Sequence, residues 1–137
     1  MARICNILVV EDDDAVRDLL GNILDFEGYE FTLVGNGSEM RAALDRDQFD
    51  VAVIDLNLAA EDGLGLAEIA SAHGCGVILT TGDPLQRPRL EASGRRHLLK
   101  PFRVRDITEL VDELLTQSGS LCERRGDCGT PSSRAAA

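Results

Sequence analysis

The feature that most constrains the fold is an alternation of short aliphatic runs with amphipathic stretches. Buried strands are predicted where the aliphatic runs occur, at 5–10, 30–34, 50–55, 77–81 and 97–99. Helices are predicted where apolar residues recur at helical spacing, at 16–24, 38–47, 63–72, 89–93 and 103–116. Strands that alternate with helices form βαβ units, and right-handed crossovers leave few topologies. We therefore expect an α/β fold, a doubly wound five-stranded parallel sheet in the order 2-1-3-4-5 flanked by helices.

The periodic pattern also sets the domain boundaries. It continues to residue 117, and the following residues are rich in Ser, Gly, Arg and Ala without any period. We expect one domain at 1–117 and a disordered C-terminal tail at 118–137. Within the domain, Pro84 and Pro88 leave little room for the fourth helix, which we expect to be distorted or partly unwound.

Composition narrows the class of protein. Twenty-four acidic residues against fourteen basic ones give a formal net charge of −10, which argues against direct contact with nucleic acid or an anionic membrane surface. No stretch approaches the roughly 18 apolar residues that a transmembrane helix needs. The apolar run at the start of the chain ends at once in four acids, unlike a signal peptide. We expect a cytoplasmic protein.

The four cysteines are Cys5, Cys75, Cys122 and Cys128. They lie far apart or in the tail, and none has the Cys-x-x-Cys spacing of a zinc site. We expect reduced thiols, as is usual in the cytosol, and neither a disulfide framework nor a zinc site.

Polar residues follow several of the predicted strands. Acids follow the first strand (Glu11, Asp12 and Asp13) and end the third (Asp55); Thr80 and Thr81 end the fourth, and Lys100 follows the fifth. In such sheets, ligands bind beyond the carboxyl ends of the strands, where the strand order reverses. We therefore expect these side chains to converge at one edge of the sheet.

Clustered acids indicate a cation. Two carboxylates about 4 Å apart repel by roughly 4 kcal/mol at an effective dielectric constant of about 20. Oxygen ligands without a nearby His or Cys select a hard ion, with Mg²⁺ preferred, and Mg²⁺ often completes its shell with phosphate oxygens. Asp55, at the tip of a buried strand, is placed to be a nucleophile that becomes an aspartyl-phosphate. The predicted chemistry is phosphoryl transfer.

Lys100 is the only lysine among the fourteen basic residues. An ammonium group is a compact point charge, whereas guanidinium is a broad planar fork. One interpretation is that this position needs a point charge to contact a phosphoryl group; the other is that the distribution arose by chance.

In these residues the sequence resembles the receiver domain of bacterial two-component response regulators, with a flavodoxin-like fold of the CheY type. The resemblance covers about residues 4–117. The motifs that carry it are, in order, Val10-Glu11-Asp12-Asp13, Asp55-Leu56-Asn57-Leu58, Asp62-Gly63, Thr81-Gly82 and Lys100-Pro101-Phe102. Each motif alone is weak, but the ordered set is specific.

The resemblance implies a role for each matched position. It implies that Asp55 is the phosphoacceptor and that Mg²⁺ is held by Glu11, through water, by Asp12, by Asp55 and by the backbone carbonyl of Asn57. The resemblance implies that the hydroxyl of Thr81 takes part in the phosphorylation switch, with Thr80 as the alternative. Lys100 matches the lysine that the family has at this position. By the same analogy, the Lys100–Pro101 peptide bond should be cis.

Two positions depart from the family pattern. His97 stands where the family usually has Tyr or Phe, the ring that swings inward on phosphorylation. His97 either still acts as a switch, with an output that depends on pH, or is a plain residue of the fifth strand. Ala59 replaces a frequent Pro, a change that should matter little.

The stretch 83–105 is basic in an acidic chain. It holds seven bases and two acids, a net charge of +5. Either this is a solvated surface, or it docks to an acidic partner or forms a homodimer through residues 83–117. No DNA-binding helix pair follows the domain, so we expect the output to pass through a downstream protein target.

Together these observations predict a phosphorelay switch. Asp55 would take a phosphoryl group from a sensor histidine kinase or a histidine phosphotransfer protein, without turnover of a separate substrate. One alternative is a phosphatase of the haloacid dehalogenase type, although that class usually has a second Asp where this chain has Asn57, and its nucleophile lies on the first strand. The other is an adaptor with the receiver fold that works without phosphorylation.

Overall fold

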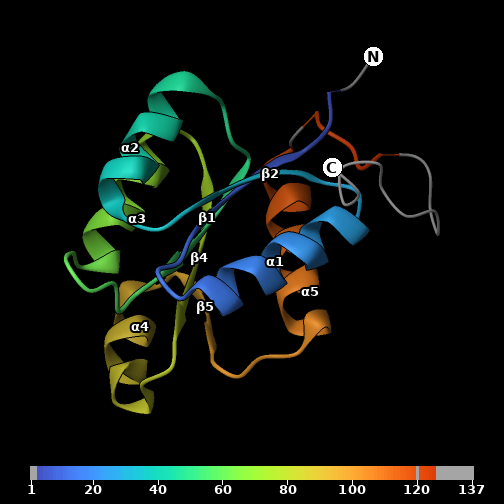
Figure 1. Cartoon of the computed structure of the whole chain (residues 1–137). Helices are drawn as coiled ribbons and strands as arrows, with labels where there is room; N and C mark the ends of the chain where they lie inside the picture. Colours follow the sequence, from blue (N-terminus) through green and yellow to red (C-terminus); the bar gives the residue numbers. More distant parts are fainter. Residues whose placement is uncertain (1–2, 120, 126–137) are drawn as a thin grey trace.

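The computed structural model describes residues 3–119 and 121–125. Its strands form one parallel five-stranded sheet in the order β2-β1-β3-β4-β5, which confirms the predicted topology (Figure 1). The strands are β1 (Asn6–Val10), β2 (Glu30–Val34), β3 (Val51–Asp55), β4 (Gly76–Thr81) and β5 (Arg96–Leu99). The chain crosses from β2 to β3 on the other side of β1, so the strand order reverses between β1 and β3. That reversal marks the expected ligand-binding edge.

Helices cover both faces of the sheet. They are α1 (Asp14–Phe26), α2 (Gly37–Arg46), α3 (Gly63–Ala72), α4 (Arg87–Ser93) and α5 (Val104–Gln117). Successive residues of a strand point to opposite faces, and β1 shows this alternation clearly. Ile7 and Val9 pack with α1 and α5 in one apolar cluster, whereas Leu8 and Val10 pack with α2, α3 and α4 in another. None of the helices in the described part of the chain has the length and apolarity needed to span a bilayer.

The fourth helix is short, as its two prolines predicted. A 3₁₀ turn, Pro84–Gln86, precedes a helix of only seven residues. Gly94 ends this helix with a positive φ of 72°, a conformation that glycine adopts without strain. Proline is tolerated in a first helical turn because the amide hydrogens there have no intrahelical acceptor.

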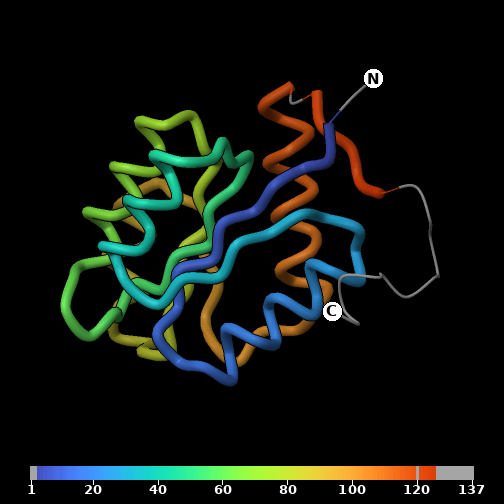
Figure 2. The backbone as a smooth tube through the Cα atoms, turned by 45° about the horizontal axis from the view of Figure 1, so that its top comes forward, coloured from blue at the N-terminus to red at the C-terminus, as the bar shows by residue number. Residues whose placement is uncertain are grey.

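The segment after α5 differs from the sequence-based expectation. Residues 118–125 were expected to be part of a disordered tail, but residues 121–125 pair with the start of the chain: the amide of Cys5 donates to Glu123 O at 2.9 Å, and the amide of Glu123 donates to Arg3 O at 2.9 Å. Figure 2 shows this segment, in red, beside the blue N-terminal strand. The expectation for residues 126–137 lies outside the described residues.

The expectation of reduced cysteines is wrong for one pair. Cys5 and Cys122 form a disulfide with Cα atoms 4.7 Å apart. The physical reason is topological: β1 begins at the edge of the sheet where α5 ends, so residues 117 positions apart in sequence meet there. Cys75 is a buried free thiol, as expected, and Cys128 lies outside the described residues.

Candidate functional site

The loop after β1 presents two carboxylates in different environments. Glu11 is 1% exposed, and its amide donates to Val34 O of β2 at 3.0 Å, which keeps it in line with the strand. Asp12 is exposed, and its carboxylate accepts from the amide of Ala59 at 3.2 Å. The amide of Asp13 donates to the Glu11 carboxylate at 3.2 Å, while the side chain of Asp13 caps α1 by accepting from the amide of Val16. The first strand therefore contributes two acids to the site and uses the third for the helix.

Asp55 ends the central strand β3 and is 4% exposed. One carboxylate oxygen accepts a hydrogen bond from the amide of Asn57 at 3.1 Å. Each of Glu11, Asp12 and Asp55 offers a carboxylate oxygen, and these oxygens all lie within 4.8 Å of one another. The predicted convergence of the three acids is thus observed.

Gly63 lets the following helix start close to Asp55. A Cβ atom at this position would lie 2.6 Å from the backbone oxygen of Asp55 and 2.6 Å from the Cα atom of Leu56. Asp62, the preceding residue, caps α3 by accepting from the amide of Leu64 at 3.1 Å. The Asp62-Gly63 pair therefore has a packing role beneath the acidic site, which the sequence motif did not reveal.

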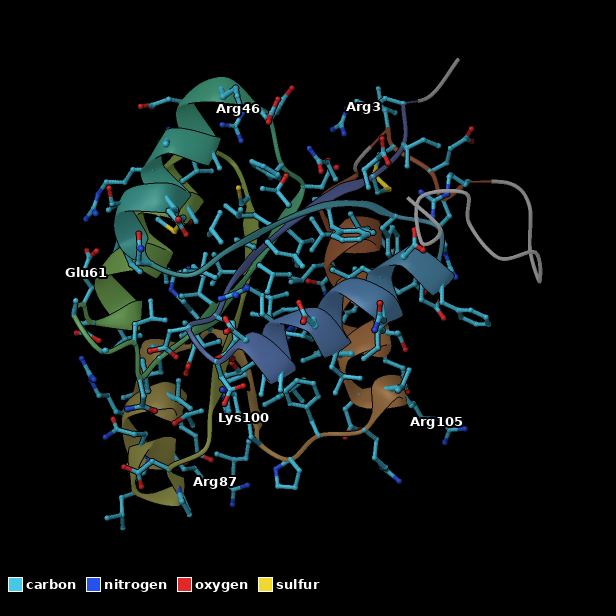
Figure 3. All side chains as sticks on the ribbon, in the orientation of Figure 1. Arg3, Arg46, Glu61, Arg87, Lys100 and Arg105 are labelled. Atoms are coloured by element: carbon cyan, nitrogen blue, oxygen red, sulfur yellow. A yellow bond between two sulfur atoms is a disulfide. The ribbon has the colours of Figure 1, made fainter. Side chains whose placement is uncertain are left out.

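Lys100, labelled in Figure 3, directly follows the last strand, and its side chain contacts two of the acids. Its backbone amide donates to Thr81 O at 2.7 Å, which continues the pairing of β5 with β4 beyond the end of the strand. Its ammonium nitrogen lies 2.7 Å from Glu11 and 3.4 Å from Asp55. The Lys100–Pro101 peptide bond is cis, as the resemblance implied.

The pKa values of this pair are shifted by burial and by their contact. Desolvation raises the pKa of Glu11, and the hydrogen bond from Lys100 offsets only part of that effect. Burial lowers the pKa of Lys100, but the hydrogen bond to Glu11 and the charge of Asp55 outweigh it, so the pKa is raised overall. Lys100 is therefore held in its charged form among the carboxylates.

The two threonines at the end of β4 have different partners. The hydroxyl of Thr81 contacts the side-chain oxygen of Asn57 and accepts a hydrogen bond from the amide of Asp83 at 3.1 Å. The hydroxyl of Thr80 is buried and has no hydrogen-bond partner in the described structure. Asn57 thus links the loop after Asp55 to Thr81 through its side chain. The family resemblance implied a role only for the backbone carbonyl of Asn57.

His97 is the second residue of β5, three positions before Lys100. It is partly buried, and its ring nitrogen Nδ1 contacts the backbone oxygen of Arg95 at 3.0 Å. This contact fits a residue of the strand, and its role as a switch stays a prediction.

The donor set fits a hard divalent cation. All three carboxylates offer oxygen, which is the ligand that Mg²⁺ prefers. Three carboxylates and one ammonium carry a formal charge of −2, which one divalent ion would balance. Hard-ion chemistry is therefore consistent with the residues that the fold brings together.

The chain is similar to response regulators both in a comparison with protein families and in a comparison with curated sequences. A model of the response regulator receiver domain family matches residues 7–112. Transcriptional regulatory protein GltR of Pseudomonas aeruginosa is 30% identical over 129 residues, which cover 89% of this chain and 53% of that protein. This chain spans about half the length of the curated relatives it matches.

Solved structures of response regulators are also similar to this chain. The receiver domain protein (CheY-like) of Methanospirillum hungatei has a TM-score of 0.76 and 30% identity, with 85% of this chain and 97% of that one covered. Response regulator TrrA of Thermotoga maritima, solved in complex with Mg²⁺ and beryllofluoride, has a TM-score of 0.73 and 29% identity, with 82% and 100% covered. This chain belongs to the receiver domain family of response regulators, the signalling proteins of two-component systems.

Proposed function

We propose that this chain is a Mg²⁺-dependent phosphoacceptor switch. Asp55 would take a phosphoryl group from a phosphohistidine on a sensor histidine kinase or a histidine phosphotransfer protein. The observation that carries the proposal is the position of Asp55: it ends a buried strand, has carboxylate neighbours within 4.8 Å, and lies 3.4 Å from the only lysine of the chain.

The transfer step needs a nucleophile and positive charge near the incoming phosphoryl group. A carboxylate oxygen of Asp55 attacks phosphorus, the new P–O bond forms, and the P–N bond to histidine breaks with the electron pair going to the leaving nitrogen. When bound, Mg²⁺ supplies charge neutralisation for the phosphoryl oxygens. Glu11 through water, Asp12, Asp55 and the carbonyl of Asn57 would hold the ion. The similar TrrA was solved in complex with Mg²⁺ and beryllofluoride, which supports Mg²⁺ as the ion.

Phosphorylation changes the charge that Lys100 and Thr81 face. A phosphoryl group adds about −1.5 to −2 charge and three acceptor oxygens. Lys100 would shift from Glu11 toward the phosphoryl group, and Thr81 would exchange its contact with Asn57 for a bond to a phosphoryl oxygen. Moving a two-state equilibrium from 1% to 99% needs about 5.5 kcal/mol, which two or three charge-assisted hydrogen bonds could supply.

The response would then spread to α4, β5 and α5. Thr81 lies at the end of β4, directly before the short α4, and Lys100 follows β5. The basic residues of 83–105 lie on these elements, so we propose that this face docks to a downstream protein target or to a second copy through residues 83–117. His97, on β5, would lie within the changing region.

Two further expectations belong to this proposal. The chain acts on its own Asp55 and turns over no separate substrate, and it works in the cytoplasm. The expectation that it contacts no nucleic acid is not supported, because relatives about twice the matched length include a transcriptional regulator. The haloacid dehalogenase alternative is not favoured, because Asp55 ends the third strand and the chain has the receiver fold.

The direct test is phosphorylation of the full chain by a small phosphodonor such as acetyl phosphate. With Mg²⁺, the wild type should gain one phosphoryl group that is labile in both acid and base, seen by intact mass, and should not gain it when the ion is chelated. Asp55→Asn should abolish the gain, whereas Asp45→Asn, the same charge change at an exposed residue of α2, should not. Persistent labelling of Asp55→Asn would show that another residue is the acceptor. Turnover of a phosphomonoester would favour the haloacid dehalogenase alternative.

A further inference from the structure

The segment 121–125, here called the strap, lies beside the start of the chain, at the edge of the sheet opposite the acidic site. It pairs with the residues before β1, and the amide of Arg125 donates to Gly28 O, after α1, at 2.8 Å. Figure 3 shows Arg3, beside the strap, and Lys100 at opposite ends of the sheet. Five residues of strand separate the two edges, a span of about 17 Å.

The strap's arginines connect three elements. Arg124 lies 2.9 Å from Glu27 at the end of α1 and 3.8 Å from Asp112 of α5, with its guanidinium 5.7 Å from the ring centre of Tyr29. Arg125 lies 3.1 Å from Asp25 of α1. The strap therefore joins the C-terminal end of α1 to α5, and these two helices cover one face of the sheet.

These noncovalent contacts are weak for a segment of this length. Leu121 is 84% exposed, and Glu123 and Arg124 are exposed as well, so the strap buries little apolar surface. The ion pairs of Arg124 are partly exposed and contribute little to stability, whereas Arg125 pairs with the buried Asp25, and ordering each residue costs conformational entropy. Among the described residues, the disulfide between Cys5 and Cys122 is the one covalent constraint that keeps the strap in place.

The two sulfur atoms differ in access. Cys5 is 2% exposed and packs in the apolar cluster under α1 and α5, whereas Cys122 is partly exposed. A reagent in solution would meet Cys122 first. Cys5 would then act as the resolving partner, because it is fixed directly before β1, where the strap pairs with the start of the chain.

We propose that Cys5 and Cys122 form a reversible redox site that controls the strap, with low-molecular-weight disulfides as the oxidant class and dithiols as the reductant class. In the oxidised chain, the strap braces α1 against α5. In the reduced chain, the strap detaches and residues 121–125 become mobile. This inference does not depend on the proposed phosphoacceptor function.

The exchange is balanced in two steps. The thiolate of Cys122 attacks one sulfur of a small disulfide, which forms a mixed disulfide and releases one thiol. The thiolate of Cys5 then attacks the sulfur of Cys122, closes the protein disulfide and releases the second thiol. Two protein thiols are oxidised, the small disulfide is reduced to two thiols, and a dithiol reverses the reaction.

The test is amide hydrogen exchange of the full chain, measured residue by residue with oxidised glutathione or with dithiothreitol. The amides of Glu123 and Arg125, both hydrogen-bonded in the strap, should exchange at least about tenfold faster after reduction. Amides in the middle of β3 should be unchanged under native conditions. Reduction should also lower the Tm by about 10 °C.

Matched variants separate the proposal from general effects of reductant. Cys122→Ser should exchange like the reduced wild type under both conditions, whereas Cys128→Ser should respond like the wild type. Peptide mapping should find Cys5 linked to Cys122. Equal exchange in both redox states, or a Cys5–Cys128 link in the oxidised protein, would overturn the proposal. Binding of Mg²⁺ and beryllofluoride should be unaffected by redox state, so loss of that binding alone would count against the phosphoacceptor site and not against the strap.

Discussion

The ammonium nitrogen of Lys100 lies 2.7 Å from a carboxylate oxygen of Glu11, a residue 89 positions earlier in the chain. Its second carboxylate neighbour, Asp55, is farther away, at 3.4 Å. Before phosphorylation, the lysine thus lies closer to Glu11, a proposed metal ligand, than to the proposed acceptor. A phosphoryl group on Asp55 would offer it stronger acceptors, which gives Lys100 two alternative positions.

Replacing Lys100 with Arg should impair switching more than metal binding. Guanidinium keeps the charge but is planar and bulky, so it cannot move as a point charge between Glu11 and a phosphoryl group. We expect Mg²⁺ affinity to change by less than about tenfold, or 1.4 kcal/mol. The beryllofluoride-induced shifts in the NMR signals of Thr81 and His97 should largely disappear. Arg103→Lys, at an exposed position before α5, is the matched control. Normal shifts in Lys100→Arg would refute the point-charge argument.

Two glycines of α3 should respond to alanine in opposite ways. At Gly63, a Cβ would lie 2.6 Å from backbone atoms of Asp55 and Leu56, so Gly63→Ala should destabilise the fold by about 1–3 kcal/mol. Gly65 has no atom within 4 Å of its added Cβ, so Gly65→Ala should stabilise the helix by about 0.5–1 kcal/mol. Urea denaturation checks both. Equal effects at the two positions would show that the close approach at Gly63 is unimportant.

Much of this site follows from the sequence because it depends on strand ends. Once five apolar strands alternate with helices, a parallel sheet places Glu11, Asp55 and Lys100 at one edge, whatever the details of the loops. The alternation of strands and helices also predicted the strand order, and the two prolines predicted the short α4. Side-chain partners are less predictable: the contact of Asn57 with Thr81 depends on how the loop after β3 turns, and no spacing rule encodes that turn.

The strap and its disulfide could not be predicted from spacing or composition. The segment after Gln117 has no periodicity, which is typical of a tail, and it is held by contacts between residues more than a hundred positions apart. A signal was available in the topology: α5 ends at the edge of the sheet where β1 begins, which brings the segment that carries Cys122 toward Cys5. Cysteine spacing along the chain does not show this proximity.

The thiol of Cys75 should resist alkylation in the folded protein. Burial, together with the negative charge of Asp50, raises its pKa to about 11, so it is protonated near pH 8. Its Sγ also contacts Phe49 O at 3.5 Å. Iodoacetamide at pH 8 should modify Cys75 only after unfolding in guanidinium, as peptide mapping would detect. Because the folded pKa is raised, the contribution to stability is present below about pH 9 and is lost as the pH rises through about 11. Rapid labelling of the native chain would contradict this.

Asp106 should stabilise the start of α5 only at pH values where it is ionised. The amide of Arg103 donates to its carboxylate at 2.9 Å and lowers its pKa below the ordinary value of 3.8. A lowered folded pKa gives stability that is present above the unfolded pKa and lost as the pH falls through the folded pKa. Asp106→Ala should therefore be less stable than the wild type at pH 7 in urea denaturation, and the difference should shrink toward pH 2. A difference that is independent of pH would assign the effect to helix propensity.

A crystal structure of the full chain with Mg²⁺ and beryllofluoride would test the phosphoacceptor site most directly. The expected result is one ion held by Asp12, Asp55 and the carbonyl of Asn57, with Glu11 bound through water. The beryllofluoride should sit on Asp55, and Lys100 and Thr81 should have moved to contact its fluorides. A structure with beryllofluoride absent from Asp55, or with the ion bound away from these carboxylates, would contradict the assignment.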